Sequence, residues 1–131
     1  MFRARALVLL VGVVGVLTFS VSSAAAHQTL VNNRVAVTLH VAPNDEPVAG
    51  EQTTVWIVRI GTSKGKFTWS RCKCTLKIFK PDGTVLLDGK APRKTQFTFP
   101  DIGAYGITVA GRVRRNNAWA AFKVTFGIRA F

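Results

Sequence analysis

Two cysteines separated by a single residue, Cys72-Lys73-Cys74, stand out in this chain as side chains able to do chemistry. In an extended strand both thiols would point to one face, with Cα atoms roughly 6.5–7 Å apart. That spacing is at the limit for an unstrained disulfide, so a bridge requires a local bulge or loop. Three interpretations stay open: a local disulfide, a thiolate pair for Cu(I) or redox switching, and two inert core thiols.

The N-terminal segment determines how the first histidine, His27, would be presented. Arg3 and Arg5 precede an uncharged run from residue 6 to 21, and Ala24-Ala25-Ala26 then supplies small residues. This arrangement predicts a signal peptide over residues 1–26, periplasmic or secreted localisation, and His27 as the first residue after cleavage. The small residues at 22–25 allow other cleavage sites. An uncleaved anchor is the alternative, although the apolar run is shorter than the roughly 20 residues of a spanning helix.

Charge is the strongest compositional signal. The chain carries 18 Lys and Arg against 6 Asp and Glu, for a net charge of +12. Cleavage of the predicted signal peptide would remove only two arginines. Residues 27–131 are long enough for one domain with a single core. We expect anionic partners, either an envelope surface or an acidic protein. We do not expect nucleic acid to be a partner of an exported protein. Membrane contact would be peripheral unless the signal peptide stays attached. Plain solubility is the alternative explanation of the charge.

The elements that must position these side chains are strands. Short alternating runs are separated by Gly, Pro, Asn and Asp, as in a sandwich or barrel, and helical periodicity is absent. We predict an all-β domain with seven strands. They span residues 34–41, 53–60, 74–80, 84–87, 95–99, 105–109 and 119–128.

A local motif narrows the fold prediction further. The run Asp101-Ile102-Gly103-Ala104-Tyr105 opens the sixth predicted strand and resembles the tyrosine corner of immunoglobulin-like sandwiches. This resemblance implies a phenol hydrogen-bonded back to the preceding connection. Ile107 stands where the second sandwich cysteine would be, so the antibody-type disulfide is absent. An unrelated β-barrel is the alternative.

When the seven predicted strands are placed in a sandwich, the charged connections fall at its two ends. The N-terminus and the connections at 61–73, 88–94 and 111–117 would share one end, and those at 42–52, 81–83 and 100–103 the other. The second end collects the acids Asp45, Glu46, Glu51, Asp82 and Asp101. The first collects Asp88, the aromatic residues Phe67, Trp69 and Trp119, and the predicted anion-binding residues. These are Lys64, Lys66, Arg71, Lys73, Arg93, Lys94, Arg112, Arg114 and Arg115, with Lys90 beside them.

A terminal His27 would offer an α-amine and an imidazole together, a chelate that suits copper. In this respect the sequence resembles the copper-resistance family of exported bacterial sandwich proteins, which also begin with histidine. The resemblance covers the architecture and His27. It implies a further histidine and a carboxylate on late strands, yet residues 95–131 contain no histidine. Cys72 and Cys74 are therefore the predicted metal-ligating partners of His27.

The second histidine, His40, is predicted to be an exposed surface residue. The thirteen residues from His27 would span roughly 40 Å if extended, which opposes a shared site.

The function expected from these features is an exported, non-catalytic binding module whose basic end meets an anionic envelope component or an acidic partner. The sequence offers no residue order suited to a catalytic triad and no phosphate-binding glycine loop. No cofactor is certain. The alternative is a periplasmic copper-binding protein using His27 with Cys72 and Cys74, and a third candidate is a structural subunit of an envelope complex.

Overall fold

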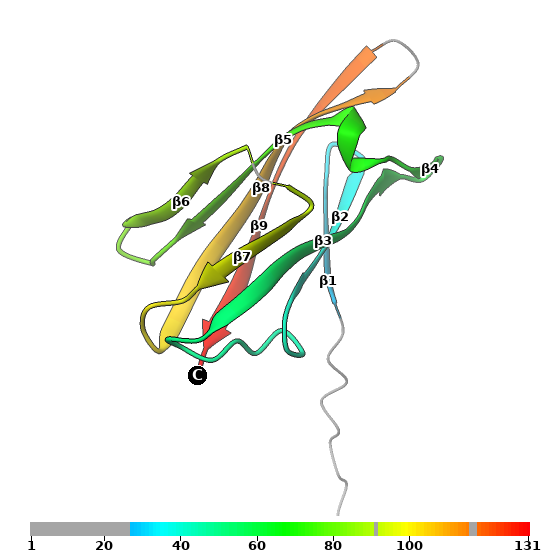
Figure 1. Cartoon of the computed structure of the whole chain (residues 1–131). Coiled ribbons are helices and arrows are strands. Elements are labelled where there is room, and N and C mark those ends of the chain that lie inside the picture. The colour runs from blue at the N-terminus through cyan, green and yellow to red at the C-terminus, as the bar shows by residue number, and fades with distance from the viewer. Residues whose placement is uncertain (1–26, 91, 116–117) are drawn as a thin grey trace, which may run out of the picture.

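The computed structural model describes residues 27–90, 92–115 and 118–131 (Figure 1). The predicted signal peptide over residues 1–26 lies outside the described residues. Among the described residues no helix has the length and apolar character needed to cross a membrane.

The described chain is all-β, as predicted. One 3-10 turn, η1 (Trp69–Arg71), interrupts a succession of strands. The strands are β1 (Gln28–Asn32), β2 (Val35–Val41), β3 (Gln52–Thr62), β4 (Gly65–Lys66), β5 (Cys72–Phe79), β6 (Val85–Gly89), β7 (Lys94–Thr98), β8 (Gly103–Arg115) and β9 (Ala118–Ala130).

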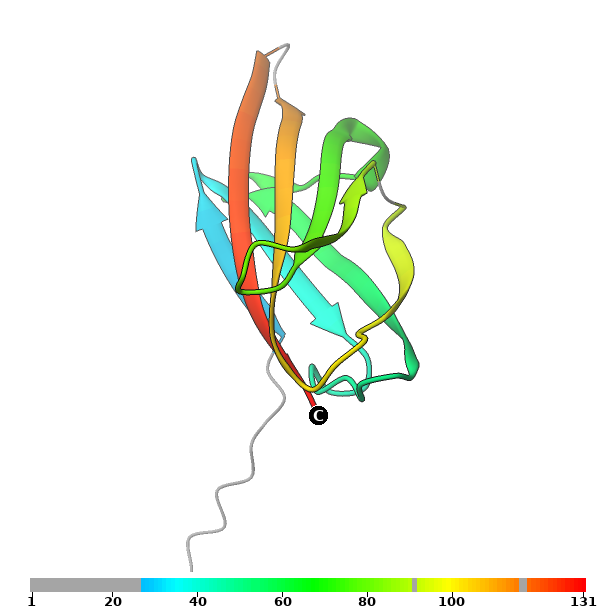
Figure 2. The ribbon, with the colours of Figure 1, turned by 90° about the vertical axis from the view of Figure 1, so that its left-hand side faces the viewer.

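These strands form two antiparallel sheets. One has the order β1-β2-β3-β4, with β7 also paired to β3, and the other has the order β6-β5-β8-β9. Figure 2 shows the two layers from the side, with β8 and β9 extending beyond the rest as a long hairpin. The arrangement is sandwich-like.

The core lies between the layers because apolar residues alternate along each strand. In β2, Val35, Val37, Leu39 and Val41 are all buried and the residues between them are not. The facing sheet contributes residues such as Ile78, Ile107, Val109 and Phe126 to the same cluster. Each such side chain contributes about 1.5–3 kcal/mol on burial, so one strand with four of them fixes its register firmly.

The predicted tyrosine contact is confirmed. The phenol of Tyr105 donates to the carbonyl of Asp101 at 2.7 Å and accepts from its amide N–H at 2.9 Å. Tyr105 is buried, and its ring packs edge-on against Phe99 with centroids 4.8 Å apart. These contacts tie the connection between β7 and β8 to the core.

The prediction of seven strands was wrong, because it missed β1 and β4. Strand β1 pairs antiparallel with β2, with Gln28 opposite Leu39, through a tight turn at Asn33 and Arg34. Both turn residues have positive φ, 47° and 65°, as the hairpin turns that match strand twist require. The N-terminus of the domain is therefore at the end opposite to the one predicted.

Candidate anion-binding grooves

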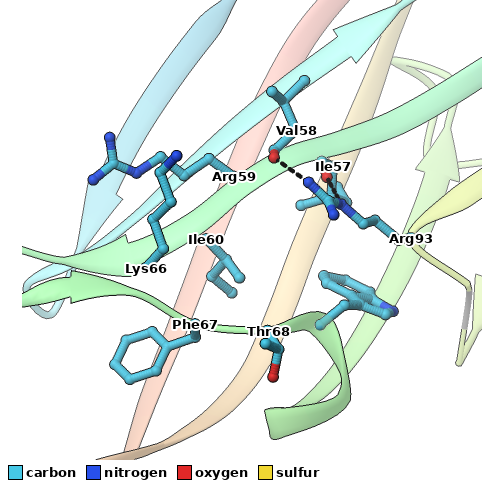
Figure 3. A pocket seen from close by; sticks show the side chains of 9 residues that line it. Ile57, Val58, Arg59, Ile60, Lys66, Phe67, Thr68 and Arg93 are labelled. Atoms are coloured by element: carbon cyan, nitrogen blue, oxygen red, sulfur yellow. Dashed lines mark hydrogen bonds between the residues drawn. The ribbon is translucent and has the colours of Figure 1, made fainter.

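Two neighbouring grooves gather the basic side chains. The tip groove, about 200 Å³, is lined by Thr62, Lys64, Gly65, Lys66, Phe67, Arg71 and Arg114. The edge groove, about 310 Å³, is lined by Ile57, Val58, Arg59, Ile60, Lys66, Phe67, Thr68, Trp69 and Arg93 (Figure 3). Because Lys66 and Phe67 line both, the grooves form one continuous surface.

The edge groove exists because β3 is left partly uncovered. Strand β7 pairs with β3 only at Gln52 to Trp56, and β4 pairs only with Gly61 and Thr62. On the other side of β3, Thr38 of β2 faces Arg59 and the next residue faces Ile57, so Val58 is an extra, bulged residue. On the side of β3 away from β2, residues 57–60 thus border a hollow between β7 and β4.

Arg93 closes one side of this hollow. Its Nε donates to the carbonyl of Ile57 at 2.9 Å, and its terminal nitrogen donates to the carbonyl of Val58 at 2.6 Å (Figure 3). The backbone N–H of Ile57 in turn donates to the carbonyl of Arg93 at 3.0 Å. The guanidinium therefore satisfies the carbonyls at the bulge and brings its positive charge to the groove.

We expect Arg93→Ala to lower the free energy of unfolding by about 1–2 kcal/mol, because two carbonyls lose charge-assisted hydrogen bonds. Chemical denaturation would measure this loss. Arg93→Lys keeps the charge without the two-pronged contact, so it should lose stability and retain anion binding. Unchanged stability in Arg93→Ala would contradict the bracing role.

The tip groove draws its cations from three parts of the chain. Lys64 and Lys66 come from the β3–β4 hairpin, Arg71 from η1, and Arg114 from the end of β8. All four side chains are exposed. No acidic residue is among the described residues that line either groove. Clustered cations without nearby acids produce a positive potential that attracts anions.

Other predicted anion-binding residues lie beside this surface. Lys73 and Arg112 are exposed and directly opposite one another across β5 and β8. Like charges in this arrangement repel, and a bound anion would relieve the repulsion. Arg115 is placed only by its backbone pairing with Ala118.

Lys94 was predicted among the anion-binding residues, but it lines neither groove. It starts β7 opposite Trp56, and its Nζ lies 4.5 Å from the centroid of the Trp56 ring. Strand β6 belongs to one sheet and β7 to the other, so Lys94 is positioned by its pairing with β3. Conversely, Arg59 lines the edge groove without having been predicted there, and its only signal was a charged residue inside an otherwise apolar strand.

The opposite end holds the acids, and several of them satisfy local donors. Asp45 accepts from the N–H of Val41 at 2.7 Å, Asp82 accepts from the N–H of Thr84 at 2.8 Å, and Asp101 pairs with Lys80 at 2.6 Å. These contacts support the interpretation that the acids form turns. These acids thus lie away from the tip groove, although Lys80 and Arg129 also lie at their end of the domain.

Two of these groups have shifted pKa values. The hydrogen bond to Asp101 raises the pKa of Lys80, and the backbone N–H of Thr84 lowers the pKa of Asp82. The Lys80 contribution to stability is present below its unfolded-state pKa and is lost as the pH rises through the raised value. The Asp82 contribution is present above its unfolded-state pKa and is lost as the pH falls through the lowered value. Lys80 is partly exposed and Asp82 is exposed, so solvent screens these contributions.

The two cysteines form a disulfide. Cys72 and Cys74 have Cα atoms 5.1 Å apart and are both buried. Cys72 follows η1 directly and is the first residue of β5. Of the three interpretations left open, the structure therefore supports the local disulfide.

The predicted metal site of His27 with Cys72 and Cys74 is not assembled. Cys72 lies opposite Val113, which lies opposite Ala120 of β9. Gln28, next to His27, donates its side-chain amide to the carbonyl of Gly127. Along β9, seven residues, or about 23 Å of strand, therefore separate the position of Cys72 from that of His27. The physical reason is β1, which carries His27 to the acidic end.

His27 instead meets His40. The two rings lie edge to face with centroids 4.5 Å apart, and the His40 side chain is only 18% exposed. The prediction of an exposed His40 that shares no site with His27 was therefore wrong. The prediction failed because it did not include the hairpin turn that pairs β1 with β2. Asn33 was its one sequence signal, since asparagine tolerates positive φ.

No protein-family model matches this chain, and neither the curated proteins nor the solved structures contain a match to it.

Proposed function

We propose that this protein is an exported, non-catalytic binding module whose basic end holds an anionic component of the cell envelope or an acidic partner. The observation that carries this proposal is the continuous surface of the edge and tip grooves. It collects basic side chains from distant parts of the chain without an acid among the described lining residues. These side chains are Arg59, Lys64, Lys66, Arg71, Arg93 and Arg114.

The residue types suit phosphate, sulfate or carboxylate groups. Arginine presents a planar fork that contacts two oxygens of such a group at once, and lysine adds mobile positive charge. Phe67 and Trp69 lie half-buried in the edge groove and pack against the core. Their rings supply a rigid apolar wall between the cations. A ligand with anionic groups on an apolar or ring-containing scaffold fits this combination best.

The separation of charge between the two ends supports directional binding. A protein with cations at one end and acids at the other is oriented by an anionic surface before contact, which raises the association rate. The acidic end would be repelled by the same surface. The domain would therefore approach with the β3–β4 hairpin and η1 leading.

We also propose that the domain is an immunoglobulin-like sandwich and that residues 1–26 direct its export. The hydrogen bonds of Tyr105 to Asp101 support the first point, since they reproduce the tyrosine-corner contact. The disulfide between Cys72 and Cys74 supports the second, because such bonds persist in oxidising compartments.

Binding to anionic and zwitterionic vesicles, and to the soluble polyanion dextran sulfate, tests the function. We expect binding to anionic vesicles and dextran sulfate at about 50 mM salt, with steep loss toward about 500 mM as screening shortens the range of the charges. Zwitterionic vesicles should not bind. Absence of binding to both anionic probes at low salt, or binding insensitive to salt, would overturn the proposal.

A further inference from the structure

The acidic end carries a second cluster, formed by His27, His40 and Asp45. Pairing of Gln28 with Leu39 brings His27 beside His40 at the end of β2. The chain then turns sharply, and the N–H of Asp45 donates to the carbonyl of Val41 at 2.7 Å. The residue before β1, one residue of β2 and one residue of the following turn therefore converge on one point.

The donor atoms are close enough to share one ion. One ligand atom from each of the three residues lies within 4.8 Å of the other two. His40 Nδ1 and Asp45 Oδ1 are 2.9 Å apart. The side chains of His40 and Asp45 are only 18% and 12% exposed, whereas His27 is exposed and covers the cluster from the solvent side.

Two buried atoms of this cluster lack a hydrogen-bond partner. They are His40 Nδ1 and Asp45 Oδ2. The 2.9 Å approach of His40 Nδ1 to Asp45 Oδ1 is thus an electrostatic contact without hydrogen-bond alignment. Buried polar atoms are normally satisfied, and leaving one unpaired costs about 1–3 kcal/mol. A coordinated cation would satisfy both atoms together.

The turn is shaped to hold the carboxylate. Asn44 and Asp45 have φ values of 51° and 60°, a region that few residues other than glycine occupy. In this conformation Asp45 Oδ1 accepts from the N–H of Val41, which fixes the carboxylate against His40. Glu46 and Glu51 in the same connection add negative charge, which favours a bound cation.

We propose that His27, His40 and Asp45 form a binding site for a divalent transition-metal ion. Two imidazoles and one carboxylate suit Zn²⁺ and Cu²⁺ and disfavour Mg²⁺ and Ca²⁺, which prefer all-oxygen sites. Cu²⁺ should bind most tightly, following the general affinity order of divalent metals. Where cleavage after Ala26 makes His27 the first residue, its α-amine is a further donor.

The site is independent of the proposed anion-binding function, since none of its three residues lines either groove. It also differs from the ligand sets considered from sequence. The disulfide between Cys72 and Cys74 contributes nothing to it. Its second histidine and its carboxylate come from the early part of the chain instead of late strands.

The test is calorimetric titration of the protein with Cu²⁺ and with Zn²⁺. The protein is used as the producing cell releases it, and its intact mass identifies the N-terminal residue. We expect one ion per chain with a dissociation constant below about 1 µM for Cu²⁺. His27→Gln, His40→Gln and Asp45→Asn should each weaken binding at least tenfold. Asn accepts the Val41 N–H and tolerates positive φ, so Asp45→Asn preserves the turn.

Glu46→Gln is the matched control, because it removes one negative charge from the adjacent, exposed position. It should change affinity less than twofold. Quenching of tryptophan fluorescence by Cu²⁺ gives a second readout, since the Trp56 ring lies 6.3 Å from that of His40. Trp56→Phe should remove much of the quenching and keep the affinity.

Three results would overturn the proposal. One is a dissociation constant weaker than about 100 µM for both ions. Another is full affinity in His40→Gln and Asp45→Asn, which would place the metal on the terminal residue alone. The third is an equal loss in Glu46→Gln, which would indicate nonspecific attraction to the acidic end. Variants of the basic grooves should bind metal normally, so failure here leaves the anion-binding proposal standing.

Discussion

Replacing Lys64, Lys66 and Arg71 together with glutamine is expected to weaken binding to anionic vesicles about a hundredfold at low salt. The three exposed side chains line the tip groove, and each cation near an anionic surface contributes about 1 kcal/mol. The same variant should also show a shallower salt dependence, because fewer ionic contacts remain to be screened. Vesicle sedimentation across a range of salt concentrations measures both effects.

The control for this variant removes the same charge elsewhere. Lys90, Lys123 and Arg129 are exposed and line neither groove. Their joint replacement with glutamine should weaken binding only a fewfold, through the change in net charge. Equal losses in the two triple variants would mean that total charge, and not the grooves, determines binding. Thermal unfolding should show both variants folded, since surface substitutions usually change stability by less than about 0.5 kcal/mol.

Gly111→Ala is expected to destabilise the domain by about 3 kcal/mol or more. Gly111 lies opposite Cys74 and has a φ of 157°, which side-chain-bearing residues rarely adopt. An added Cβ would overlap the carbonyl oxygen of Lys73 and lie 2.8 Å from the Cα of Cys74. Both neighbours are backbone atoms, so neither can move aside without separating β5 from β8. Chemical denaturation measures the change.

Gly127→Ala is the matched control, because an added Cβ there meets nothing within 4 Å. It should be neutral or slightly stabilising, since alanine restricts the unfolded chain. A loss below about 1 kcal/mol in Gly111→Ala would contradict the close approach of β5 and β8. In the expected case the displaced strands carry Lys73 and Arg112, so residual folded protein should also bind polyanions less well.

The sequence predicted those parts of the fold in which a local pattern is strong. Alternation in β2 is complete, with four buried residues, and the contact of Tyr105 with Asp101 is encoded within five residues. Strand β1 gives no such signal, because it is an edge strand whose residues are nearly all exposed. Strand β4 is only two residues long.

The candidate site could be predicted only in outline. Alternating connections correctly brought Lys64, Lys66, Arg71 and Arg114 to one end, because strand order alone requires it. The edge groove depends on where β7 and β4 stop pairing with β3, and these limits leave no trace in composition or periodicity. The placement of His27 followed from the missed β1, so its partners were assigned at the wrong end.

The most direct test of the central claim is a titration of the isotope-labelled protein with a short sulfated oligosaccharide, followed by backbone amide NMR. We expect chemical-shift changes to cluster at residues 57–71, at Arg93, and at Arg112 and Arg114, and to vanish at high salt. Changes concentrated at residues 42–51 or 81–84, or spread evenly over both sheets, would show that the basic grooves are not the binding surface.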